Sequence, residues 1–350
     1  MPRTWRSAPR RRWAASRFQH PGMCYRQPSP ASRLGSGALD LYARDVKRHR
    51  VLRRVLVGLG CLLVLAGAAV GWGWWYFHPP FTEARGLVYG ERHGKQLVFD
   101  VLRPAHPHGA GVLVLVSGSW KSSADGVHPA LMAPLLRRGY LVFAVHHGSQ
   151  PEFTVMEIIS DVQRATRYIR HHAADYGLNP HRLGVSGGSS GGHLSLMLAT
   201  RGGPGVPDAS DPVDRESSAV QAAALFFPVT DLLNLGKSTE NPGDGGPPKS
   251  FVRAFGPDAT NLAAWKVIGR ETSPIYHITT NLPPMLIIHG GADTLTPLEQ
   301  SEWFVARARE VGAEVQLIVR PGKRHGWPTM VWDIRRFADW YDVHLRERGT

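Results

Sequence analysis

The pattern of hydrophobic and polar positions divides the chain into three regions. Residues 1–45 show little periodicity and are rich in Arg, Ser, Pro and Gly, which is typical of disordered segments. Residues 55–77 form an apolar run of 23 residues that contains no charge. From about residue 80 onwards, short apolar runs alternate with longer segments of helical spacing.

The third region predicts a mostly parallel β-sheet with helices on both faces. The predicted strands cover residues 87–92, 96–103, 111–117, 140–145, 182–185, 222–227, 285–288 and 315–319. The predicted helices cover residues 130–138, 153–172, 190–200, 297–311 and 331–345. Such alternation indicates an α/β domain, here over residues 80–350. The Gly-, Pro- and Asp-rich segment 202–248 interrupts the alternation, and we expect a lid-like insertion there.

The apolar run at residues 55–77 is long enough to cross a membrane. At about 1.5 Å per residue it spans a hydrocarbon core of about 30 Å. Arg53 and Arg54 directly precede it, and Trp74 and Trp75 lie near its far end. We therefore expect a single-pass anchor, with the basic tail of residues 1–54 cytoplasmic and the α/β domain extracytoplasmic. A cleaved signal peptide is the alternative, because residues 66–68 (Ala-Gly-Ala) resemble a cleavage site.

The charge distribution argues against a nucleic-acid partner. The whole chain carries a net charge of +13, but residues 1–54 hold 14 basic and two acidic residues. The remaining chain is nearly neutral, with 27 basic and 26 acidic residues, so the α/β domain has no general basic field for a polyphosphate. Both cysteines, Cys24 and Cys61, precede the domain. This excludes an internal disulfide or a cysteine-based metal site there.

One motif in the α/β region predicts a nucleophile. Residues 187–191 (Gly-Gly-Ser-Ser-Gly) match G-x-S-x-G, between the predicted strand at 182–185 and the predicted helix at 190–200. A serine in a tight strand-to-helix turn exposes its oxygen, and the flanking glycines leave room for the backbones to cross. We therefore expect Ser189 to be a catalytic nucleophile.

A serine hydroxyl needs a base, and the base needs an orienting carboxylate. In this type of fold the acid and then the histidine follow the serine along the chain. Asp293 and His325 come directly after the predicted strands at 285–288 and 315–319, at the sheet edge where the serine is expected. We therefore predict Asp293 as the acid and His325 as the base. Asp231 follows the preceding strand and is kept as the alternative acid.

The negative oxygen that develops during acyl transfer needs N–H donors. We expect one from Ser190, which directly follows the nucleophile. The second is expected from the loop after the strand at 111–117, where Ser119 and Trp120 are the candidates. The segment 146–151, after the next strand, either shapes the substrate pocket or packs among the loops.

Together these segments resemble the α/β-hydrolase superfamily. In particular, residues 187–194 (Gly-Gly-Ser-Ser-Gly-Gly-His-Leu) are similar to the nucleophile turn of carboxylesterases related to acetylxylan and feruloyl esterases. The resemblance covers roughly residues 85–347. It implies hydrolysis of carboxylic esters without a cofactor, with Ser189, Asp293 and His325 as nucleophile, acid and base. Many lipase-like relatives carry His-Gly-Gly in the oxyanion loop, where this chain has Ser-Gly-Ser at residues 117–119.

Three functions fit this sequence. The first is a serine esterase acting on short acyl esters, such as acetyl groups on a small molecule or a glycan. The second is a prolyl-oligopeptidase-like serine peptidase, which shares the fold and the order of the triad but usually carries a large additional N-terminal domain. The third is a membrane-anchored, non-catalytic protein with a hydrolase fold, which an intact triad disfavours.

Overall fold

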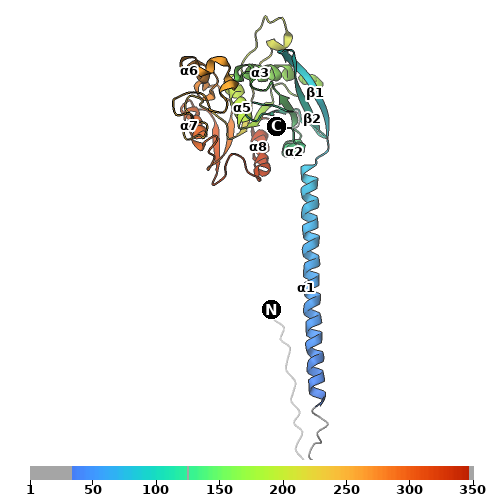
Figure 1. Ribbon diagram of the computed structural model, residues 1–350. Coiled ribbons are helices and arrows are strands. Elements are labelled where there is room, and N and C mark those ends of the chain that lie inside the picture. The colour runs from blue at the N-terminus through green and yellow to red at the C-terminus, as the bar shows by residue number, and fades with distance from the viewer. Residues whose placement is uncertain (1–33, 124–125, 347–350) are drawn as a thin grey trace, which may run out of the picture. The chain divides into compact units, whose positions relative to one another are not determined.

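The computed structural model describes residues 34–123 and 126–346 and contains one eight-stranded sheet (Figure 1). The strands are β1 (Phe81–Arg92), β2 (Lys95–Pro104), β3 (Gly111–Leu115), β4 (Leu141–His146), β5 (Leu183–Gly188), β6 (Ala222–Phe226), β7 (Met285–Gly290) and β8 (Val315–Arg320). Their order across the sheet is β1-β2-β4-β3-β5-β6-β7-β8. β2 runs antiparallel to both β1 and β4, and all other neighbouring pairs are parallel. The predicted mostly parallel sheet is confirmed.

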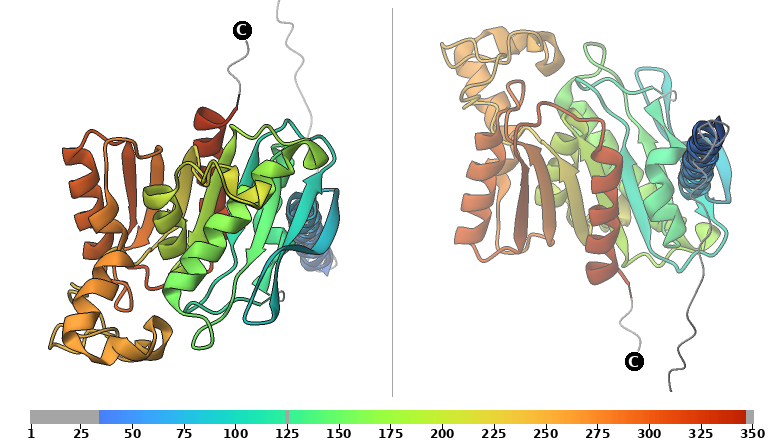
Figure 2. Two further views of the ribbon diagram at one scale, coloured as in Figure 1. Left: turned by 90° about the horizontal axis from the view of Figure 1, so that it is seen from above. Right: turned by 90° about the horizontal axis from the view of Figure 1, so that it is seen from below.

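Helices cover both faces of this sheet (Figure 2). The helices of the α/β region are α2 (Pro129–Arg137), α3 (Val155–His171), α4 (Ala173–Tyr176), α5 (Ser190–Arg201), α6 (Leu262–Glu271), α7 (Leu298–Glu310) and α8 (Met330–His344). Buried side chains of α3, α5 and α7 belong to one hydrophobic cluster, and those of α2 and α8 belong to a second. The central strands contribute to both clusters, since successive side chains of a strand point to opposite faces. This explains why these strands are apolar throughout rather than alternating.

The first helix, α1 (Leu34–Phe77), is longer than the apolar run suggests. Its segment Leu39–Phe77 has a mean hydropathy of 2.3 in its most apolar window, and no part of that window is buried. The helix begins 21 residues before the predicted start at Val55, so residues 34–54 are helical and not disordered as predicted. Residues 1–33 of the predicted disordered tail lie outside the described residues. The chain separates between Ala69 and Val70 into two units, and the second contains the whole sheet.

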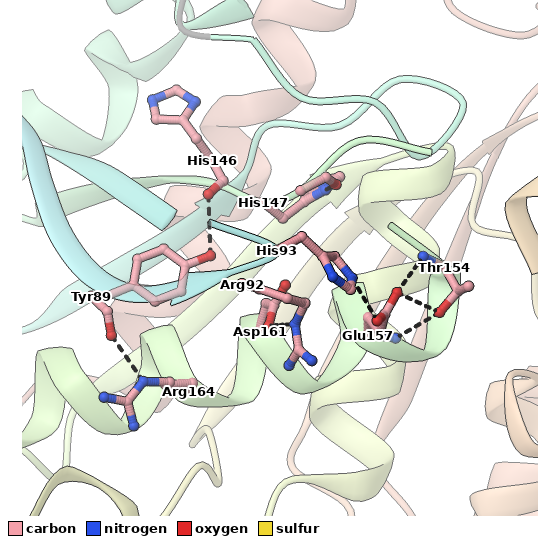
Figure 3. Close-up of polar contacts among 10 residues, drawn as sticks. Tyr89, Arg92, His93, His146, His147, Thr154, Glu157, Asp161 and Arg164 are labelled. Atoms are coloured by element: carbon pink, nitrogen blue, oxygen red, sulfur yellow. Dashed lines mark hydrogen bonds and ion pairs between the residues drawn. The ribbon is translucent and has the colours of Figure 1, made fainter. Parts of the chain in front are cut away.

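Charged side chains fix the tip of the β1–β2 hairpin against α3 (Figure 3). Arg92 Nε donates to Asp161 Oδ1 at 2.8 Å, and His93 Nε2 lies 2.9 Å from Glu157 Oε1. Burial raises the pKa of Asp161 to about 6, although the neighbouring Arg92 favours its charged form. Thr154 begins α3 with a reciprocal capping box, because its side chain accepts from the Glu157 N–H while that carboxylate accepts from the Thr154 N–H.

The predicted insertion at residues 202–248 has different boundaries in the structure. β6 lies within this range, so residues 202–248 belong to two separate connections, one before β6 and one after it. The part before β6 packs against α3, where Arg164 donates to Asp211 and Asp214. The part after β6 continues to β7 at Met285 and includes α6. We call residues 227–284 the β6–β7 connection.

Candidate active site

Ser189 occupies a strained turn between β5 and α5. Its backbone has φ 57° and ψ −122°, which is unusual for a residue with a side chain. A Cβ atom on Gly187 would lie 2.4 Å from the backbone of Gly191, and one on Gly191 would lie 2.7 Å from the Leu115 carbonyl oxygen. Gly187 is therefore needed where β5 and α5 cross, as the motif predicts, and Gly191 is needed where α5 approaches the end of β3.

The structure brings Ser189, His325 and Asp293 into one chain of hydrogen bonds. His325 Nε2 lies 2.8 Å from Ser189 Oγ, and His325 Nδ1 lies 2.7 Å from Asp293 Oδ2. Since a carboxylate only accepts, the Nδ1–H donates to Asp293, and Nε2 is left to accept the proton of the serine hydroxyl. This is the arrangement in which an imidazole can act as a base toward a serine.

The carboxylate of Asp293 is held in its charged form. Burial alone would raise its pKa, but the nearby imidazole of His289, the bond from His325 and backbone bonds lower it to about 2. Asp293 Oδ1 accepts from the N–H groups of Leu295 and Thr296 at 2.9 and 3.0 Å. His289 Nε2 lies 3.6 Å from Asp293 Oδ2 and bonds to the Thr296 carbonyl at 2.7 Å. The charged acid can therefore orient the His325 ring over a wide pH range.

The loop after β8 reaches Asp293 because it packs directly on the end of β7. A Cβ atom on Gly290 would lie 2.5 Å from the carbonyl oxygens of both Lys323 and Arg324. The Ala292 N–H donates to the Lys323 carbonyl at 2.8 Å, which joins the two loops. Only a glycine at position 290 allows this approach, and His325 follows immediately in the same loop.

The alternative acid, Asp231, has other partners. Its Oδ1 accepts from the N–H groups of Leu233 and Asn234 at 2.9 and 3.0 Å, and the Tyr276 hydroxyl donates to both carboxylate oxygens. Burial raises the pKa of Asp231, while these hydrogen bonds oppose that effect. Asp231 therefore stabilises the start of the β6–β7 connection, and it is Asp293 that contacts His325.

The predicted oxyanion donors lie beside the nucleophile. Gly118 and Lys121 exchange two backbone hydrogen bonds of 2.9 Å, which close a tight turn over Ser119 and Trp120. Both central residues have positive φ, 54° and 55°, which matches a type I′ turn. Ser190 is the first residue of α5, and N–H groups in the first turn of a helix have no acceptor within the helix. We call residues 118–121 the oxyanion turn.

A cavity of about 50 Å³ lies against Ser189. Ser119, Trp120 and Ser190 are among the residues that line it. Its apolar lining comes mainly from the β6–β7 connection, with Leu295 from the loop after β7; the connection contributes Val229, Leu232, Leu235, Pro248 and Phe251. The part of the predicted insertion that lies after β6 therefore covers the site, whereas the part before β6 does not line it.

The segment 146–151 supports the oxyanion turn and does not line this cavity. The Gln150 N–H donates to the Trp120 carbonyl at 3.0 Å, and its side-chain amide donates to the Ser119 carbonyl at 3.3 Å. The Ser122 N–H donates to the Ser149 hydroxyl at 2.9 Å. Of the two roles considered for this segment, packing among the loops is the one observed.

Sequence reasoning missed two buried histidines near the site, His193 and His289. Both are fully buried, and each bonds through both ring nitrogens. Each of these histidines lies in a segment of otherwise apolar or small residues, which is a weak indication that its ring is buried. The sequence gives no indication of its hydrogen-bond partners. Among the described residues, no group of three or more His, Cys, Asp or Glu side chains is arranged to hold a metal ion.

Comparisons with known proteins agree with this fold. The model of the BD-FAE family matches residues 99–307. The esterase LipQ of Mycobacterium tuberculosis is 31% identical over 66% of this chain and 54% of its own length. The probable carboxylic ester hydrolase LipM of the same organism is 29% identical over 65% of this chain and 52% of its own length. The chain thus spans about half the length of these curated relatives.

Solved structures show the same fold over most of the chain. A truncated carbohydrate esterase from gut microbiota has a TM-score of 0.61 at 25% identity and covers 75% of this chain and 96% of its own. An esterase of Thermogutta terrifontis has a TM-score of 0.57 at 25% identity and covers 78% of this chain and 95% of its own. The resemblance to α/β-hydrolase esterases is confirmed, and the chain belongs to the BD-FAE family.

Proposed function

We propose that this protein is a serine esterase that hydrolyses short acyl esters through an acyl-enzyme. The observation that carries the proposal is the unbroken hydrogen-bond chain from Ser189 through His325 to Asp293. The esterase names of the relatives and of the structural neighbours support the same reaction class. Small-molecule and glycan esters are the proposed substrates.

In the first half of the proposed reaction, Ser189 Oγ attacks the ester carbonyl carbon while its proton passes to His325 Nε2. The carbonyl oxygen becomes negative and accepts from the N–H groups of Ser190 and of the oxyanion turn. The intermediate collapses when the bond to the alcohol oxygen breaks and that oxygen takes the proton from His325. The acyl group is then an ester of Ser189, and Asp293 remains a carboxylate throughout.

Water completes the cycle. It attacks the acyl carbon, gives one proton to His325 Nε2 and forms a second tetrahedral intermediate at the same donors. Ser189 leaves as its alkoxide and recovers the proton from His325, so the products are the carboxylic acid and the free serine. Each half uses the same imidazole as base and then as acid, which explains why no cofactor is needed for the proposed chemistry.

The cavity beside Ser189 argues for a short acyl group. A water molecule needs about 10–15 Å³ by this measure, so about 50 Å³ holds only a few heavy atoms. We expect the full chain, purified in detergent, to hydrolyse p-nitrophenyl acetate with a higher kcat/KM than the butyrate, and to hydrolyse the octanoate most slowly. We expect the apolar side chains that line this small cavity to disfavour the longer chain.

Shortening one of these side chains tests the assignment of the cavity. Leu235→Ala is expected to raise the octanoate-to-acetate ratio of kcat/KM at least threefold. Val305→Ala, at an equally buried position on α7 that does not line the cavity, should leave the ratio unchanged. An unchanged ratio in a folded Leu235→Ala variant would show that this cavity does not receive the acyl chain.

We also propose that α1 anchors the protein in a membrane with the α/β domain outside the cytoplasm. Its segment Leu39–Phe77 is long and apolar enough to span one, and its exposed Trp74 and Trp75 suit a headgroup region. Basic residues before the apolar stretch favour a cytoplasmic N-terminus.

Extraction and fusion experiments check this anchoring. The full chain expressed in bacteria should stay in the membrane after alkaline carbonate washing, and alkaline phosphatase fused after Thr350 should be active. A protein released without detergent, with a mass that corresponds to a start after Ala68, would instead identify a cleaved signal peptide. An inactive phosphatase fusion would reverse the topology.

A further inference from the structure

The oxyanion turn is held in place by a contact that lies outside the proposed catalytic groups. The side chain of Trp120 is only 3% exposed. Its indole Nε1–H donates to His193 Nδ1 at 3.1 Å. His193 is the third residue after Ser190 on α5, so this bond connects the oxyanion turn to the helix that begins at the nucleophile.

The His193 ring is itself fixed at its other nitrogen. His193 Nε2 donates to the Thr272 carbonyl oxygen at 2.6 Å, and Thr272 directly follows α6. The proton is therefore on Nε2, and Nδ1 is the acceptor for the Trp120 indole. His193 is fully buried, and burial lowers its pKa to about 4, so the ring stays neutral and can accept from Trp120 near neutral pH.

Aromatic side chains of the β6–β7 connection close around the same indole. Phe251 and Phe255 contact the Trp120 ring edge-on, with ring centroids 5.5 and 5.4 Å away. Phe255 in turn packs edge-on against Trp265 of α6. The Trp120 ring therefore lies between α5 and the segment that covers the cavity, and it cannot shift without disturbing both.

The oxyanion turn needs such support because its backbone is strained. Positive φ angles at Ser119 and Trp120 are unfavourable for residues that carry side chains, so the turn would relax if its contacts were lost. Relaxation would move the N–H groups away from the position that the negative oxygen takes. An oxyanion donor acts only if it is already aimed at that position.

We propose that His193 is a positioning residue, which holds the oxyanion turn through the Trp120 indole and thereby determines the rate of acyl transfer. This inference rests on the proposed esterase function. It assigns His193 no contact with the substrate and no proton transfer. Its loss is expected to weaken stabilisation of the transition state while substrate binding is retained.

His193→Leu removes the acceptor and leaves the buried indole N–H without a partner. Trp120→Phe removes the donor but retains an aromatic ring. For both variants of the full chain in detergent, we expect kcat on p-nitrophenyl acetate to fall about tenfold to a hundredfold, with KM within about threefold of wild type. His193→Asn can place its amide oxygen near the position of Nδ1, so it should recover most of kcat.

A trifluoromethyl ketone separates positioning from general destabilisation. Ser189 Oγ adds to its carbonyl carbon, the serine proton passes to His325, and the carbonyl oxygen becomes an oxyanion within the site. Its inhibition constant should rise in His193→Leu and Trp120→Phe by about the same factor as kcat falls. The control is Thr166→Val, which removes a fully buried hydrogen bond on α3. It should lower Tm without changing either quantity.

The proposal is overturned if folded Trp120→Phe and His193→Leu keep kcat and the inhibition constant within twofold of wild type, whatever their Tm. If His193→Leu does not fold, Trp120→Phe and His193→Asn provide the test. Failure of the esterase proposal would look different, because wild type itself would then neither hydrolyse p-nitrophenyl acetate nor bind the ketone.

Discussion

Ser189→Ala is expected to lower kcat for p-nitrophenyl acetate by about 10⁵-fold or more, to the rate that binding and the oxyanion donors alone support. The substitution removes the only atom that the proposed mechanism acylates. It leaves the His325–Asp293 bond of 2.7 Å in place, so the fold and Tm should change little. KM for any residual reaction should stay within a few-fold of wild type.

The control for this variant is Ser186→Ala, three residues earlier on β5. The Ser186 hydroxyl is buried and donates to the Ala224 carbonyl at 2.8 Å, so its loss tests stability rather than chemistry. We expect it to retain most of the wild-type kcat. Steady-state assays compare kcat of the two variants at equal concentrations of folded protein. A Ser189→Ala protein that retains more than a few per cent of wild-type kcat would rule out Ser189 as the nucleophile.

Asp293→Asn is expected to lower kcat about 10³- to 10⁴-fold. An amide in place of the carboxylate can donate to His325 Nδ1, which favours the ring tautomer with its proton on Nε2, facing the Ser189 hydroxyl. That tautomer cannot accept the proton of the serine. The imidazolium that forms during the reaction would also lose its neighbouring negative charge.

The pH dependence of this variant is also predicted. Hydrogen bonds hold the pKa of Asp293 at about 2, so in wild type its carboxylate stays ionised above about pH 3. Protonation of Asp293 therefore does not affect the pH dependence of wild-type kcat between about pH 5 and 9. The loss of kcat in Asp293→Asn should persist across that range. Asp231→Asn is the comparison, because Asp231 bonds to Tyr276 and the β6–β7 connection rather than to His325. A larger loss of kcat in Asp231→Asn than in Asp293→Asn would reassign the acid.

The sheet was predictable because its central strands are buried on both faces. The continuous apolar runs at residues 141–145 and 285–288 leave little ambiguity, because they alternate along the chain with segments of helical periodicity. The start of α1 was not predictable from hydropathy, because charged residues do not end a helix and residues 38–54 contain no proline or glycine. Asp45 and His49, one turn apart at 3.5 Å, lie within this charged part of the helix.

The three residues proposed for catalysis were predictable because each follows a strand end or its turn in a fixed order along the chain. The supporting contacts were not. α6 (Leu262–Glu271) is capped by Asn261, whose side chain accepts from the N–H groups of Ala263 and Ala264, but no element was predicted between residues 249 and 284. Likewise, no spacing in the sequence relates Trp120 to His193, 73 residues away, because their contact depends on how β3 and β5 pair.

Covalent labelling directly tests whether Ser189 is the nucleophile. The full chain in detergent is treated with a fluorophosphonate, followed by intact-mass measurement and peptide mapping, beside Ser189→Ala. We predict one adduct per chain, on Ser189, with activity lost in proportion to labelling and no adduct in the variant. A folded protein that hydrolyses p-nitrophenyl acetate but is not labelled, or is labelled at another residue, would contradict this prediction.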